Sequence, residues 1–179
     1  MEGLLPNHPG GDIEIALARL EERAALDRLI QLYIHDFSEL WAGTPRGELR
    51  DDGSFWMYPL EPYWEQAGRV PLLIRRAGKL AGFALVNAVT HSGRAADRNM
   101  AEFFIVRKHR RSGLGRAAAQ TIFSRYAGLW EVAVARRNVA AQAFWRGAIG
   151  SHPAVRDIEE FDQATAEWDG PIMRFRIAP

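Results

Sequence analysis

The 179-residue sequence contains no cysteine, which excludes disulfides, thiolate metal sites and a protein thiol as nucleophile. It also has no apolar run of about 18 residues or more, so the sequence predicts no membrane-spanning helix and no membrane partner. A basic region followed by an apolar one, as in secretory signals, is missing from the N-terminus. We therefore expect a cytoplasmic protein.

An excess of charge of one sign is also missing. The 23 Lys and Arg residues nearly balance the 22 Asp and Glu residues, and the formal net charge is +1. Such a balance gives no long-range attraction to nucleic acid or anionic lipid. The basic run at residues 107–111 is therefore local, either a solvated loop or part of a phosphate site, and nucleic-acid binding through it is the weakest alternative.

The rest of the composition is that of a soluble globular protein, with 47% apolar and 25% charged residues. The length predicts a single domain over residues 1–179. Residues 1–11 are rich in turn formers and are predicted to be loose. Periodicity predicts strands at 13–17, 70–76, 80–90, 99–106, 130–135, 157–161 and 172–177, a hairpin turn at 77–79, and helices at 21–40, from 117 to a C-cap at Gly128, and 138–146.

Residues 110–117 read Arg-Arg-Ser-Gly-Leu-Gly-Arg-Ala and connect an apolar strand to a helix. The two glycines allow a tight turn and close approach of a ligand to the backbone. The first turn of the helix offers unpaired N–H groups and the positive end of its dipole, and the arginines suit phosphate geometry. The stretch predicts a diphosphate site; the alternative is a plain connection with a solvated basic run.

Two well-known phosphate motifs are absent, since the chain has neither GxxxxGK[ST] nor a complete GxGxxG. Residues 110–117 instead resemble motif A of the GCN5-related N-acetyltransferase (GNAT) family, (Q/R)-x-x-G-x-(G/A), with matches at Arg110, Gly113 and Gly115. Residues 138–145, Asn-Val-Ala-Ala-Gln-Ala-Phe-Trp, resemble the N-x-x-A-x-x-F-Y segment of the same family. The predicted order of strands and helices is also similar to the order in that family.

This resemblance implies an α/β fold with a mixed, mostly antiparallel central sheet flanked by helices, in which two parallel strands splay apart. It implies acetyl-coenzyme A as the co-substrate, no metal, and a cofactor-binding core at about residues 99–146. The strand would contact the thioester and pantetheine arm, the loop would hold the diphosphate, and the second motif would touch the arm from the other strand. The cofactor-binding residues implied are Phe103, Ile105, Arg110, Arg111, Ser112, Gly113, Leu114, Gly115, Arg116, Asn138 and Trp145.

The activity implied by the resemblance is direct acetyl transfer to a primary amine, which must lose a proton before it attacks. Glu102 is our candidate for the general base, because desolvation inside an apolar strand raises a carboxyl pKa. The alternative is a salt bridge to a neighbouring arginine. Some family members carry the base at the position of Asn99, which in a regular strand lies on the opposite face from Glu102. Only a bulge would reconcile the two positions.

The chain departs from the family pattern at Ile149-Gly150, where the family commonly has Gly-Phe, and at one residue that matters for the mechanism. The usual general acid is the tyrosine of the second motif, and this chain has Trp145 there. An indole N–H cannot act as an acid near neutral pH. Either the thiolate leaves unassisted, or Tyr33 or Tyr126 replaces the acid, or the protein binds acyl-coenzyme A without catalysing transfer.

The acceptor side is predicted at about residues 30–69, with tentative substrate contacts from Tyr33, Phe37 and Trp41. Residues 41–69 are irregular but carry many aromatic rings among acidic residues. The rings either close the edge of the core or form a wall of a pocket that attracts an amine. The partners expected are acetyl-coenzyme A and a small-molecule or peptide amine, without nucleic acid; the amine's identity and a homodimer stay open.

Overall fold

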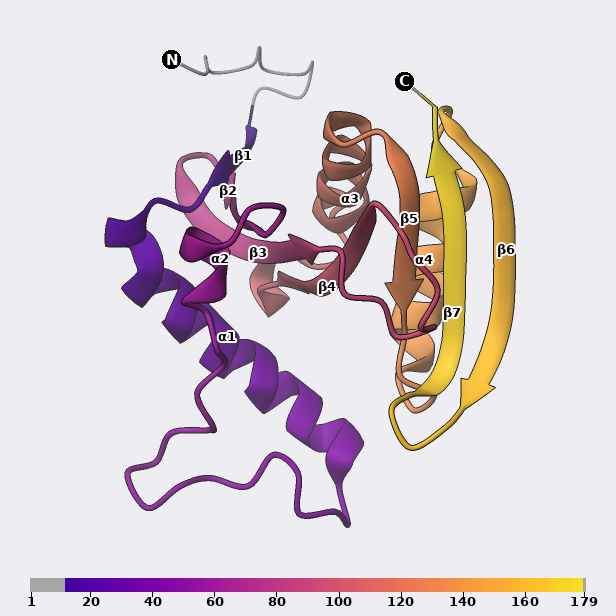
Figure 1. Cartoon of the computed structure of the whole chain (residues 1–179). Coiled ribbons are helices and arrows are strands. Elements are labelled where there is room, and N and C mark those ends of the chain that lie inside the picture. Colours follow the sequence, from indigo (N-terminus) through magenta and orange to yellow (C-terminus); the bar gives the residue numbers. More distant parts are fainter. Residues whose placement is uncertain (1–11, 179) are drawn as a thin grey trace.

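The computed structural model describes residues 12–178, and the segment predicted to be loose, 1–11, lies outside the described residues. One seven-stranded sheet has the order β1-β2-β3-β4-β5-β7-β6 (Figure 1). Neighbouring strands are antiparallel except β4 and β5, which are parallel, and this arrangement confirms the predicted fold class. The strands are β1 (Ile13–Leu17), β2 (Val70–Arg76), β3 (Lys79–Asn87), β4 (Arg98–Ile105), β5 (Gly128–Ala133), β6 (Val155–Ala164) and β7 (Asp169–Ile177). The helices are α1 (Arg23–Ser38), α2 (Pro62–Glu65), α3 (Leu114–Arg125) and α4 (Val139–Gly150).

Helices cover both faces of the sheet, with α1 and α2 on one face and α3 and α4 on the other (Figure 1). Alternate residues of β3 divide between the two cores, as the period of a strand requires. Phe83 and Leu85 pack in the core under α1, whereas Ala84 and Val86 pack in the core under α3 and α4. All four side chains are fully buried, so β3 is the central strand that its two-sided apolar sequence predicts. Within residues 12–178, none of the helices is both long and apolar enough to cross a membrane.

The β2–β3 hairpin turns where it was predicted. Ala77 and Gly78 have φ angles of 48° and 71°, and two successive positive φ values are typical of the tight hairpin turn that matches strand twist. β3 ends at Asn87, earlier than the predicted residue 90. The Asn87 side chain accepts a hydrogen bond from the Val89 N–H at 2.9 Å, which starts a turn and ends the strand.

The predicted C-cap at Gly128 is wrong, because α3 ends at Arg125 and Gly128 is the first residue of β5. A glycine is needed there for another reason. Its φ is 122°, and a Cβ atom would lie 2.7 Å from Oδ2 of Asp97. That same oxygen accepts a hydrogen bond from the Leu129 N–H at 2.7 Å, so the glycine lets the carboxylate hold the start of β5.

The parallel strands β4 and β5 pair only at their beginnings, Arg98 with Trp130 and Asn99 with Glu131. Beyond these pairs the strands separate, and the splayed pair implied by the family resemblance is present. Parallel strands that separate leave backbone N–H and C=O groups without a partner strand. The sheet therefore opens at its centre, where β4 and β5 are no longer paired.

A buried ion pair fixes the turn that follows β3. Glu131 and Arg174 are 0% and 4% exposed, and their charged groups lie 2.7 Å apart. Glu131 also accepts hydrogen bonds from the N–H groups of His91 and Ser92, and Arg174 donates to the carbonyl of Ala95 at 2.6 Å. Because a buried charge needs several partners, this network gives the turn one conformation and positions His91.

Candidate active site

A cavity of about 740 Å³ lies where β4 and β5 separate. On one side it is bounded by α1 and the segment 41–58, and on the other by the start of α4. Tyr33 and Glu102 belong to the α1 side of the sheet, whereas Met100 and Trp145 pack in the core under α3 and α4. Residues from both faces of the sheet therefore line the cavity.

Glu102 lies in the wall of this cavity, on β4. Its carboxylate accepts a hydrogen bond from the Tyr33 hydroxyl and has no ion pair within residues 12–178, so the alternative of a salt bridge is not realised there. Burial raises the pKa of Glu102 to about 7, against the opposing effect of the Tyr33 and Tyr58 hydroxyl groups. A carboxyl group with this pKa can exchange protons near neutral pH.

A β-bulge decides which way Glu102 points. In the β3–β4 pairing Leu85 is opposite Glu102 and Val86 is opposite Met100, so Ala101 is an extra residue. The bulge resets the alternation and brings Asn99 to the same face as Glu102. The Asn99 amide donates to Asn87 at 3.2 Å, and Asn87 in turn donates to the Tyr63 hydroxyl of α2 at 3.2 Å. The two positions that a regular strand would separate are thus on one face.

The candidates for a general acid lie in different places. Tyr33 and Tyr58 line the cavity. Burial is the main cause that raises the pKa of both phenols, and the nearby Glu102 charge is the second, so both phenols stay protonated. Tyr126 is not among the lining residues; its ring packs under the Arg98 guanidinium at 5.5 Å. Trp145 is 6% exposed and packs at 5.2 Å from the Phe103 ring, so it forms a wall of the cavity.

The residues predicted to contact the coenzyme arm divide into two groups. Phe103, Asn138 and Trp145 line the cavity, whereas Ile105 is 7% exposed and packs in a core cluster with Leu114. Asn138 is the N-cap of α4, and its side-chain oxygen accepts a hydrogen bond from the Ala141 N–H at 3.1 Å. Capping fixes the side chain at the cavity wall, and its amide NH₂ makes no hydrogen bond within residues 12–178.

The predicted diphosphate loop, residues 110–116, does not line this cavity but begins α3 beside it. Gly113 is the N-cap with φ 83°, and a Cβ atom there would meet no protein atom within 4 Å. At Gly115 a Cβ atom would be 3.3 Å from the Phe144 ring, so this glycine brings α3 and α4 close together. A helix N-terminus that faces open space through a glycine fits an anionic diphosphate.

The arginines of this loop have different roles. Arg110 donates to the Ile105 carbonyl at 2.7 Å, forms an ion pair with Asp36 of α1, and lies 5.3 Å from the centre of the Phe104 ring. Its guanidinium group therefore ties the loop to α1. The side chains of Arg111 and Arg116 are exposed and make no hydrogen bond or ion pair to residues 12–178. Within the described residues, these two side chains are therefore unpaired cations that flank the N-cap of α3, Gly113.

Substitution Asp36→Asn tests this connection. Burial raises the pKa of Asp36, but hydrogen bonds from Arg107 and Arg110 outweigh it and lower the pKa overall. A lowered pKa stabilises the fold above the usual aspartate pKa, and the benefit disappears as the pH falls through the lowered value. We expect the variant to lose about 1 kcal/mol of unfolding free energy at pH 7 and nothing near pH 2, measured by urea unfolding.

The matched control for this test is Asp51→Asn, because Asp51 is exposed and makes no ion pair within the described residues. Its unfolding free energy should not change at either pH. Equal stability of Asp36→Asn and the wild type at pH 7 would contradict the assigned role of the ion pair.

Several residues of the cavity were not predicted as site residues. Trp56 and Tyr58 were recognised only as members of an aromatic segment, and His91 and Trp168 were not recognised at all. The His91 and Trp168 rings lie 4.1 Å apart, although 77 positions separate them in the sequence. Phe55 and Tyr63 of the same aromatic segment are buried in the core under α1. The segment therefore closes the core and also forms a wall of the cavity.

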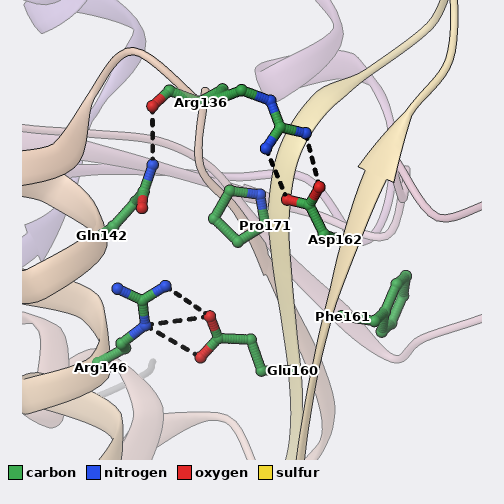
Figure 2. Close-up of a pocket in the computed structure, with 7 residues that line it drawn as sticks. All are labelled: Arg136, Gln142, Arg146, Glu160, Phe161, Asp162 and Pro171. Atoms are coloured by element: carbon green, nitrogen blue, oxygen red, sulfur yellow. Dashed lines mark hydrogen bonds and ion pairs between the residues drawn. The ribbon is translucent and has the colours of Figure 1, made fainter.

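A second cavity, of about 420 Å³, lies between α4 and the β6–β7 hairpin (Figure 2). Its charged side chains neutralise one another, as Figure 2 shows: Arg136 bonds to Asp162 at 2.7 Å and Arg146 to Glu160 at 2.6 Å. Paired, exposed charges have little left to offer a ligand. We assign the active site to the larger cavity. Within residues 12–178, no group of three or more His, Asp or Glu side chains is placed to hold a metal ion.

A mixed sheet that opens between two parallel strands, with a glycine-capped helix beside the opening, defines an acetyltransferase fold. The model of the acetyltransferase (GNAT) family matches residues 26–150, and the chain belongs to this family of N-acetyltransferases. None of the curated proteins matches the chain.

Solved structures share the fold at low sequence identity. An acetyltransferase from Thermus thermophilus is 15% identical with a TM-score of 0.60, covering 91% of this chain and 94% of its own. The PaiA N-acetyltransferase of Thermoplasma acidophilum, in complex with coenzyme A, is 11% identical with a TM-score of 0.59, covering 92% and 98%. YncA, a putative acetyltransferase from Salmonella typhimurium with its cofactor acetyl-CoA, is 14% identical with a TM-score of 0.54, covering 92% of both chains.

Proposed function

We propose that the protein transfers the acetyl group of acetyl-coenzyme A to a primary amine by direct attack, with Glu102 as the general base. The observation that carries the proposal is the position of Glu102. This carboxylate, with a pKa of about 7, lies at the opening between β4 and β5, in a cavity that residues from both faces line. An amine from the α1 side and a thioester from the α4 side would meet beside it.

The coenzyme is proposed to bind the core at residues 99–146, and the amine to enter beside the segment 30–69 of a single domain. Two structures with the same fold hold coenzyme A or acetyl-coenzyme A, which supports this co-substrate. The N-terminus of α3 and the free cations Arg111 and Arg116 would receive the diphosphate, with the Gly113 backbone in contact. Asn138 and Trp145 would hold the pantetheine arm, and Tyr33, Phe37 and Trp41 the amine.

The chemistry starts from an ammonium group with a pKa near 10, which must lose a proton before nitrogen can attack the carbonyl carbon. Glu102 accepts that proton. Strand N–H groups left unpaired by the separation of β4 and β5 would stabilise the negative charge that develops on the acetyl oxygen. The C–S bond then breaks, and the thiolate, with a pKa of about 8.5, leaves without help from residue 145.

One observation favours a second candidate function, a non-catalytic acyl-coenzyme A-binding protein: the indole of Trp145 occupies the position of the family's acid. Thiol release from acetyl-coenzyme A, followed with a panel of primary amines, separates the two. We expect amine-dependent release. Binding of acetyl-coenzyme A by calorimetry without release for any amine would support the non-catalytic protein.

A further inference from the structure

Aromatic rings make up about half of the residues that line the part of the cavity on the α1 side. One wall has the ring series Tyr33, Phe37 and Trp41, with centroid distances of 4.6 Å and 5.6 Å between successive rings. Trp56 and Tyr58 extend it, 5.6 Å apart. His91 and Trp168 come from the turn after β3 and from the β6–β7 hairpin, and their rings lie 4.1 Å apart at an angle of 35°. A planar, apolar ligand body would find rings on several sides.

Charge in this part of the cavity is limited. Of the lining residues, Glu102 and Glu48 are acidic, and Glu48 is exposed two positions from the exposed Arg46, whose guanidinium lies 5.7 Å from the Trp41 ring centre. These two charges have opposite signs, and both belong to exposed residues. Burial lowers the pKa of His91, which is therefore neutral at pH 7. A single carboxylate, Glu102, remains inside to meet a positive charge.

We propose that the acceptor is an arylalkylamine, a primary amine with one positive charge on a short chain that carries an aromatic ring. The inference rests on the proposed function and adds the class of substrate. The ammonium group would lie against Glu102, and the ring against Trp56 on one wall and Trp168 on the other. Edge-to-face and offset ring contacts favour an aromatic body over an alkyl chain of the same length.

The competing acceptors fit less well. A polyamine would bring further positive charges, for which the cavity lining offers only the exposed Glu48, while Arg46 of the same lining is itself positive. Aromatic rings also attract cations, and spermidine is therefore one of the acceptors tested below. A peptide terminus would bury amide groups that need hydrogen-bond partners, and a wall of rings provides few of these.

Thiol release from acetyl-coenzyme A tests the proposal with four acceptors: 2-phenylethylamine, n-butylamine, spermidine and an unmodified peptide. We expect kcat/KM for 2-phenylethylamine to exceed that for n-butylamine by about tenfold, the value of one good ring contact. Preference for spermidine, n-butylamine or the peptide overturns the aromatic acceptor while leaving acetyl transfer intact. If none of the four acceptors produces thiol release, although acetyl-coenzyme A binds, the proposed function is overturned as well.

Variants locate the contact. Trp56→Ala and Trp168→Ala should each reduce the ratio of kcat/KM for 2-phenylethylamine over n-butylamine by about fivefold to tenfold. A variant that loses its fold would lower kcat/KM for both amines and would also bind acetyl-coenzyme A more weakly. A changed ratio with an unchanged affinity for acetyl-coenzyme A therefore identifies a specific effect on the ring contact. Leu49→Ala is the matched control, because Leu49 is 58% exposed on the same segment and does not line the cavity. An unchanged ratio in both tryptophan variants overturns the proposal.

Discussion

Replacement of Glu102 by glutamine should reduce kcat/KM for the amine by about a hundredfold to ten-thousandfold, the usual contribution of a positioned general base. The amide keeps the shape of the side chain and can still accept the hydrogen bond from Tyr33. It cannot take up the proton of the ammonium group. The measurement is thiol release at saturating acetyl-coenzyme A, with the affinity for acetyl-coenzyme A determined separately by calorimetry.

The pH dependence makes this test specific. A base works only when deprotonated, so wild-type kcat should rise with pH through the Glu102 pKa of about 7. In Glu102→Gln that rising limb should be absent. Glu65→Gln is the matched control, because Glu65 is an exposed carboxylate on α2 outside the cavity, and its profile should follow the wild type. If kcat of Glu102→Gln still rises with pH through about 7 as in the wild type, the general base is another group.

Stability should change in the opposite direction from activity. The folded-state pKa of Glu102 is raised above its usual value, so the folded protein binds a proton more tightly than the unfolded chain. The contribution of Glu102 to the free energy of unfolding is therefore fully present below the usual glutamate pKa, and it is lost as the pH rises through about 7. At pH 8 we expect Glu102→Gln to melt several degrees above the wild type, whereas near pH 4 the difference should vanish. A lower melting temperature at pH 8 would show that the carboxylate is stabilising.

The order of the strands and helices could be predicted because each element carries its own periodicity. β3 is apolar on both faces, α1 has one apolar stripe, and Ala77-Gly78 has the residues of a hairpin turn. The loop before α3 could also be recognised locally, because glycines between a strand and a helix permit a tight turn wherever they occur. Element boundaries were less accurate, since a side chain distant in sequence, Asp97, determines why Gly128 is a glycine.

The parts of the site that could not be predicted depend on contacts between distant segments. The bulge at Ala101 has no glycine or proline to mark it and exists in the pairing of β3 with β4. His91 and Trp168 meet because the Glu131–Arg174 ion pair holds one turn against the β6–β7 hairpin. The ion pair between Arg110 and Asp36 likewise forms only because the end of α1 lies beside the loop. Residue types alone do not contain such information.

Replacement of Gly113 by valine should raise the dissociation constant for acetyl-coenzyme A by about a hundredfold, equal to a loss of about 2.7 kcal/mol. A Cβ atom at this position would meet no protein atom within 4 Å, so the new side chain projects into the space assigned to the diphosphate. Its φ of 83° also disfavours valine, and the strain tends to turn the free N–H groups away from their common ligand.

Backbone strain also destabilises the fold as a whole, and Gly68→Val separates that general effect from a local effect at the binding site. Gly68 has the same φ of 83°, lies between α2 and β2, and likewise offers open space, since a Cβ atom there would meet no protein atom within 4 Å. Both variants should lose about 1–2 kcal/mol of unfolding free energy, the usual strain of a left-handed residue with a side chain. Only Gly113→Val should lose affinity for acetyl-coenzyme A. Equal dissociation constants in calorimetry would place the diphosphate away from the N-terminus of α3, and the arrangement of both substrates around Glu102 would need another explanation.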